Sequence, residues 1–147
     1  MTTARLVSEP LRVDRLRNGD RRLVRDLAID LGVDVGLGED RYPGFSVSDS
    51  GTTLVTVPEG FETDFSSIPS WARALYRFDS VDLAGCCHDL AYRVGVPRKA
   101  ADKIWQIVAT SGERRVSRFR GWLGWLGLRI GAGFAYKPTG DPLKRHN

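Results

Sequence analysis

Imidazole chemistry in this chain of 147 residues is restricted by its two histidines. His146 lies in the polar C-terminal tail, so a histidine base would have to be His88, in the segment CCHDLAYRVG. On a helix, His88 and Tyr92 share one face because they are four residues apart, while Asp89 is rotated by about 100°. The segment therefore predicts an imidazole and a phenol side by side, with a carboxylate next to them.

Asp102 is the carboxylate that could orient the His88 ring. If the chain reverses near Val96, His88 lies about 12 Å before the turn and Asp102 about 9 Å after it. On two antiparallel helices the pair would lie at similar heights, so Asp102 could accept from one ring nitrogen and leave the other as a base. Such a pair is typical of a hydrolase that activates water directly. The oxyanion would need an electrophile, which a cation held partly by Asp89 could supply.

The same spacing also has a structural interpretation. His88 could be a buried, hydrogen-bonded histidine whose ring does no chemistry. In that case Asp102 would pair with Arg98, and Asp89 with Arg93, each at a distance of one helical turn. Spacing alone leaves the catalytic and structural interpretations open.

The elements that must position these residues change from strands to helices near residue 64. Hairpins are expected about Asn18-Gly19 and Ser50-Gly51, because both pairs favour tight turns between alternating residues. These segments predict three or four strands in one small sheet. Two helices should follow, one with Ser80 as its N-cap and Gly95 as its stop, and one with Pro97 in its first turn and Gly112 as its stop.

Two further helices complete the expected fold. A short one is predicted over 69–77, and Asp64 before it could either cap this helix or face the His88 cleft. Apolar residues three and four apart from Val116 to Phe134 predict a long C-terminal helix. The fold class is therefore α+β, with a small N-terminal antiparallel sheet packed on a helical hairpin and a long C-terminal helix. A single domain is expected, strand-rich over 1–63, helical over 64–136 and ending in a tail over 137–147.

Composition excludes several classes of protein. Cys86 and Cys87 are adjacent, so a disulfide framework is not expected, and a zinc site with His88 is excluded because no second His or Cys group completes four ligands. No signal peptide or membrane-spanning segment is expected.

Charge is concentrated in residues 112–147, which hold eight basic and two acidic residues within a chain of net charge +4. This segment could pack in the core or between subunits, lie on an anionic membrane surface, or contact nucleic acid. No motif for sequence-specific recognition of nucleic acid accompanies its arginines.

Three segments, VPEGFETDFSSIPSWA, CCHDLAYRVG and PRKAADKIW, resemble the phage and prophage family called domain of unknown function 1353 over about residues 50–135. The family's motif residues match here as Val57, Pro58, Gly60, Phe61, Thr63, Asp64, Ser67, Pro69, His88, Asp89, Tyr92, Arg98 and Asp102. The resemblance implies a phage origin and no settled activity.

HDLAY followed by AADKIW is also similar to phospholipase A(2), especially its parvoviral type. That resemblance implies His88 as the general base, Tyr92 as a hydrogen-bond donor and Asp102 as the orienting carboxylate. It implies Asp89 as a calcium ligand, and Asp64 is the nearest candidate for a second one. The chain lacks the Gly-rich calcium loop of that class.

These resemblances give two expected functions. The first is a virion or assembly component built on the His-Asp hairpin, with other phage structural proteins or a second copy as partners, in the virion or the host cytoplasm. The alternative is an active phage hydrolase of phospholipase A(2) type, a metal-assisted esterase in which His88 activates water and which would meet an anionic membrane surface.

Overall fold

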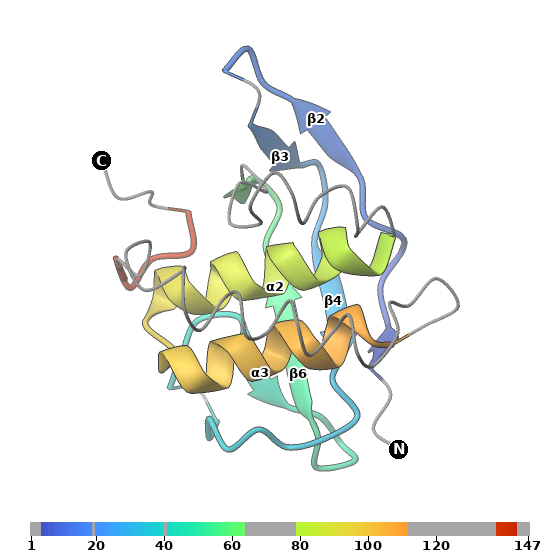
Figure 1. Ribbon diagram of the computed structural model, residues 1–147, viewed down its shortest axis with the longest axis vertical. Coiled ribbons are helices and arrows are strands. Elements are labelled where there is room, and N and C mark those ends of the chain that lie inside the picture. The colour runs from blue at the N-terminus through green and yellow to red at the C-terminus, as the bar shows by residue number, and fades with distance from the viewer. Residues whose placement is uncertain (1–3, 19, 40, 64–78, 112–137, 144–147) are drawn as a thin grey trace.

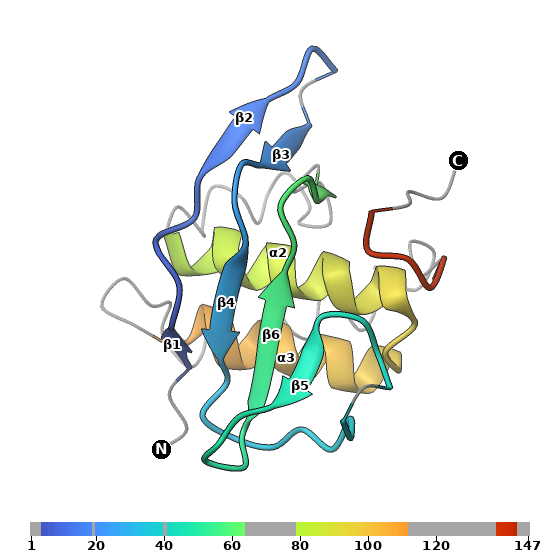
Figure 2. The same cartoon turned by 180° about the vertical axis from the view of Figure 1, so that it is seen from behind.

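The computed structural model describes residues 4–18, 20–39, 41–63, 79–111 and 138–143. Within these residues the fold is α+β, as predicted, with two antiparallel sheets followed by two helices. The two views in Figures 1 and 2 show both helices side by side against one face of the larger sheet. A helical hairpin resting on a sheet is therefore the frame that holds the candidate site.

The larger sheet has four strands in the order β1-β4-β6-β5. These strands are β1 (Arg5–Leu6), β4 (Leu27–Asp30), β6 (Thr53–Val57) and β5 (Phe45–Val47). Buried and half-buried residues alternate along β6, which places Val55 and Val57 on its core side. Leu27 and Ile29 of β4 lie opposite these valines in the ladder and are also buried. The sheet thus presents one apolar face to the helices.

The expectation of one sheet is wrong, because a second sheet of three strands is present. Its strands, in the order β2-β3-β7, are β2 (Val13–Arg15), β3 (Arg21–Leu23) and β7 (Glu62–Thr63). The N–H of Leu23 donates to the Phe61 oxygen and the N–H of Gly60 donates to the Leu23 oxygen, both at 2.9 Å. Pro58 has no N–H for a continuous ladder, and Gly60 has a φ of 85°. The chain therefore bends between β6 and β7, and the pairing continues in a separate sheet.

Both predicted hairpins are present. β2 and β3 pair on either side of Asn18, whose Oδ1 accepts a hydrogen bond of 3.0 Å from the N–H of Asp20. β5 and β6 pair about Ser50-Gly51, where Gly51 has a φ of 77°. The amide side chain and the glycine close their turns as these residue types usually do.

The predicted helical hairpin is formed by α2 (Asp79–Val94) and α3 (Arg98–Ala109). Gly95 ends α2 with a φ of 89°, and the N–H of Val96 donates back to the Ala91 oxygen at 2.9 Å. The chain thus reverses where the sequence predicts it.

Two helix ends differ from the prediction. α2 begins at Asp79, so Ser80 lies inside the helix and is not its N-cap. α3 ends at Ala109, before Gly112 is reached, and Thr110 is its C-cap residue. The Thr110 hydroxyl donates to the Gln106 oxygen at 2.7 Å.

A single cluster of buried side chains joins the sheet to the helical hairpin. The largest of its fully buried side chains are Trp105, Phe61, Leu23, Leu27, Ile29, Leu31, Leu90, Ile104, Val55 and Val57. Cys86 and Cys87 are buried in the same core and form no disulfide with a described residue, and burial raises the pKa of Cys87 to about 12. The buried face of α2 is therefore fixed by the sheet on one side and by α3 on the other.

Gly44 lies at a close approach between the sheet and α2. It has a φ of 85°, and an added Cβ would lie 2.7 Å from the Thr56 oxygen and 2.9 Å from Leu90 Cδ2. We expect Gly44→Ala to lower the free energy of unfolding by about 2–3 kcal/mol, because it combines backbone strain with overpacking. Gly51→Ala is the matched control, since Gly51 has a similar φ and open space around it. Its expected cost is about 1 kcal/mol. If urea unfolding gave equal losses of stability for Gly44→Ala and Gly51→Ala, the close contact at Gly44 would be contradicted.

Three predicted features lie outside the described residues. They are the short helix over 69–77, the long C-terminal helix and Asp64. Across the parts that the structure does describe, no helix has both the length and the apolar character needed to span a membrane.

Candidate active site

The hydrogen bond predicted between His88 and Asp102 is present. His88 Nε2 lies 2.8 Å from Asp102 Oδ1, and the two side chains are 1% and 0% exposed. His88 projects from α2 and Asp102 from α3, on either side of the turn at Val96. Since a carboxylate can only accept, Nε2 is the donor when Asp102 is ionised. The other ring nitrogen, Nδ1, makes no hydrogen bond within the described part of the chain.

Tyr92 shares the same carboxylate oxygen. Its hydroxyl donates to Asp102 Oδ1 at 3.0 Å, and its ring centroid lies 4.1 Å from that of His88. The planes of the two rings meet at 43°. One oxygen of Asp102 therefore fixes both the imidazole and the phenol that the spacing on α2 places together.

Arg98 extends this network toward the start of α3. Its Nε lies 3.5 Å from the Tyr92 hydroxyl oxygen, to which it donates. Burial raises the pKa of Tyr92 to about 12, and the negative charge of Asp102 acts in the same direction against the lowering effect of Arg98. Contact with Tyr92 in turn raises the pKa of Arg98 above its usual value. Tyr92 thus remains a protonated donor throughout the physiological range.

Asp89, the other acidic residue of the motif, is held by the end of the second sheet. The hydroxyl of Thr63 on β7 donates to Asp89 Oδ2, and Thr63 is buried. Arg93, one turn further along α2, donates to the backbone oxygen of Glu62 at 2.8 Å. Its guanidinium carbon lies 4.1 Å from the centroid of the Phe61 ring. Two contacts therefore attach β7 to the helix that carries His88.

The sequence did not predict that Thr63 and Arg93 position α2 against β7. Thr63 is one of the matched family motif residues, and that match was the signal that could have pointed to it. Arg93 was expected only as an ion-pair partner of Asp89, whereas its guanidinium binds the backbone oxygens of Glu62 and Pro142. Helical spacing could predict neither set of contacts, because each joins a residue of α2 to a residue outside that helix.

The described residues do not make up a calcium site. Asp89 is the one expected ligand among them, and in these parts of the chain no group of three His, Cys, Asp or Glu side chains could hold a metal ion. Asp64, the other expected ligand, lies outside the described residues. A calcium ion bound here would polarise a carbonyl oxygen.

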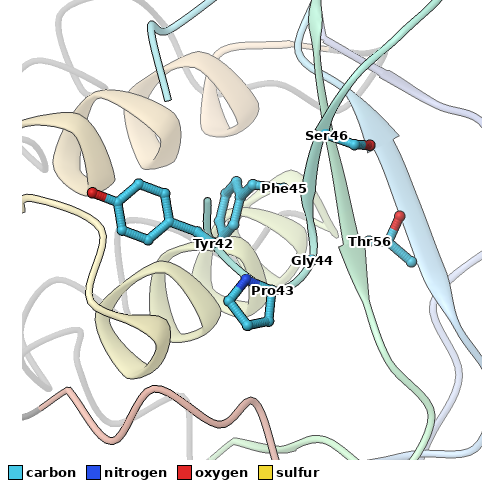
Figure 3. Close-up of a pocket in the computed structure, with 6 residues that line it drawn as sticks. All are labelled: Tyr42, Pro43, Gly44, Phe45, Ser46 and Thr56. Carbon is cyan, nitrogen blue, oxygen red and sulfur yellow. The ribbon is translucent and has the colours of Figure 1, made fainter. Parts of the chain in front are cut away.

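A shallow pocket of about 310 Å³ lies away from this network, at the β5 edge of the larger sheet. Figure 3 shows its lining, which comes from the residues just before and within β5 and from β6. The residues are Tyr42, Pro43, Gly44, Phe45, Ser46 and Thr56. None of the predicted site residues lines it.

The raised pKa of Tyr92 gives a test of the network by pH. Because the folded state holds the phenolic proton more tightly than the unfolded chain, its contribution to stability is fully present below pH 10 and is lost toward pH 12. We expect the free energy of unfolding to fall more steeply between these values in the unmodified protein than in Tyr92→Phe. Urea unfolding across this range measures both slopes, and parallel curves would contradict the buried phenol.

Comparison with known proteins identifies the family. Residues 43–128 match the model of the family described as protein of unknown function (DUF1353). Comparisons with curated proteins and with solved structures gave no match. The family match spans more than half of the chain, from just before β5 through both helices of the candidate site. The chain therefore belongs to the DUF1353 family of proteins of unknown function.

Proposed function

We propose that this chain is a phage hydrolase in which His88 activates water for attack on an ester. The observation that carries this proposal is that His88 and Tyr92 both donate to Asp102 Oδ1. This arrangement fixes the imidazole tautomer with the proton on Nε2 and leaves Nδ1 as a base. It favours catalysis over the assembly function, which was the first expectation from the sequence.

The reaction balances with water as the only co-reactant. Nδ1 takes a proton from water while the water oxygen bonds to the ester carbonyl carbon. The tetrahedral intermediate then collapses, the bond to the alkoxide breaks, and the alkoxide takes the proton back from Nδ1. Asp102 stabilises the transient imidazolium through its hydrogen bond to Nε2. The products are a carboxylic acid and an alcohol.

Two features support phospholipid as the ester. The helical hairpin holds His88, Tyr92 and Asp102 in the relation that the resemblance to phospholipase A(2) implies. The sequence also places its largest excess of positive charge in the C-terminal segment, which would favour an anionic lipid surface.

A virion or assembly component is the second candidate function, and the burial of the pair favours it. His88 is 1% exposed and Asp102 is 0% exposed, so substrate could reach Nδ1 only if the covering residues move. In this role the network would specify how α2 and α3 pack, and other phage proteins or a second copy would be the partners.

The test is hydrolysis of phosphatidylglycerol vesicles by the full chain, with calcium present so that a missing cation cannot cause failure. We expect free fatty acid and lysophospholipid in equal amounts, measured by mass spectrometry. Fatty acid release must be lost in His88→Gln. Absence of both products from the folded protein would contradict the hydrolase and leave the assembly function.

A further inference from the structure

The β2–β3 hairpin carries positive charge that the proposed hydrolase does not use. Residues 11–25 contain six arginines and two aspartates, a net charge of +4. In Figures 1 and 2 this hairpin projects from the body beyond α2 and the larger sheet. Its charge is therefore carried on a protruding hairpin.

Besides Arg22, three of these arginines are exposed: Arg12, Arg15 and Arg17. Within the described residues their side chains form no ion pair or hydrogen bond. Two other arginines of the hairpin bind the protein itself, since Arg22 pairs with Glu62 at 2.7 Å and Arg25 pairs with Glu9. The hairpin thus uses some arginines to fix its position and leaves others facing solvent.

The two sides of the hairpin differ in charge. On one side, Asp14 lies opposite Arg22, so opposite charges face each other across the ladder. On the other side, Arg15 lies opposite Arg21. Arg17 follows two residues after Arg15 and adds to the charge near the tip. Positive charge is therefore gathered on this side of the hairpin.

We propose that this arginine-bearing side of the β2–β3 hairpin binds the phosphate backbone of double-stranded DNA without reading its sequence. A guanidinium matches the geometry of a phosphate and can bind it through two N–H groups.

The exposed side chains of the hairpin favour DNA over a membrane surface. In the described chain the exposed large hydrophobic residues are Leu6, Val7 and Leu143, and none belongs to the hairpin. A membrane-binding ribbon would be expected to bear apolar side chains that enter the lipid. Arginine without such anchors is typical of phosphate-backbone contact, which is electrostatic and depends strongly on salt.

The test compares two double variants that each remove two positive charges. Arg15→Gln with Arg17→Gln removes charge from the hairpin, and Lys99→Gln with Lys103→Gln removes it from exposed positions on α3. Fluorescence anisotropy with a labelled DNA duplex is measured from about 50 to about 200 mM NaCl. We expect the hairpin variant to bind about tenfold more weakly at low salt, with a salt slope reduced by about 1.8, and the α3 variant to bind as the unmodified chain does.

Three results would overturn the proposal. They are no binding of DNA by the unmodified chain, equal loss in both variants, and arginine-dependent binding to phosphatidylglycerol vesicles without binding to DNA. Thermal unfolding checks that both variants are folded, and Arg17→Gln alone serves if the double variant is not. DNA binding and ester hydrolysis are measured separately, so neither result decides the other.

Discussion

Asp102→Ala should lower the free energy of unfolding by about 3–5 kcal/mol, the largest loss of stability expected from a single substitution in this network. Asp102 is fully buried and accepts from both His88 Nε2 and the Tyr92 hydroxyl. Without it, two buried donors lose their acceptor at once, and each unmet donor costs about 1–3 kcal/mol. Urea unfolding measured by circular dichroism would give the difference.

Lys103→Ala is the matched control for this loss. Lys103 is the next residue on α3, it is exposed, and it shares the helical background of Asp102. We expect it to change stability by less than about 0.5 kcal/mol. A similar small change for Asp102→Ala would mean that the shared oxygen does not hold the two helices together.

His88→Gln should reduce ester hydrolysis by about a thousandfold, the largest effect expected on activity. General-base catalysis contributes about 10²–10⁴ to the rate, and glutamine has no basic nitrogen to take a proton from water. Glutamine can still donate to Asp102, so the fold should be retained. Initial rates on phosphatidylglycerol vesicles, with thermal unfolding as a check on the fold, provide the measurement.

Asp102→Asn tests the same hydrogen bond by changing the acceptor of the His88 ring. An amide in this position can donate to the ring, which would favour the proton on the wrong nitrogen of His88. We expect most of the activity to be lost in Asp102→Asn and to be retained in Lys103→Gln. If the protein hydrolyses ester and His88→Gln remains fully active, the base lies elsewhere.

The pairing of His88 with Asp102 was predictable because helix geometry is regular. The positions of His88 and Asp102 relative to Val96 were enough to place them at one height, and glycine at position 95 marked the turn. Tyr92 followed from its four-residue spacing on the same helix. Local periodicity therefore accounts for the three residues that lie on the helical hairpin.

The second sheet was not predictable from the same kind of pattern. Alternation continues from Leu23 to Leu27 in the sequence, but the chain bends between them, and Pro58 and Gly60 bend the partner segment at the matching place. Which segments pair after such a bend depends on tertiary packing. For the same reason the contact of Thr63 with Asp89, and that of Arg93 with the Glu62 backbone, could not be derived from spacing.

In the proposed hydrolase, Asp102 leaves Nδ1 of His88 free to act as the base. The position of the ring proton is measured by ¹⁵N NMR of His88 at a pH where the ring is neutral. The hydrogen bond of 2.8 Å from Nε2 to Asp102 predicts a proton on Nε2 and none on Nδ1, and this pattern should be lost in Asp102→Asn. A neutral ring with its proton on Nδ1 in the unmodified protein would contradict the assignment of Nδ1 as the base.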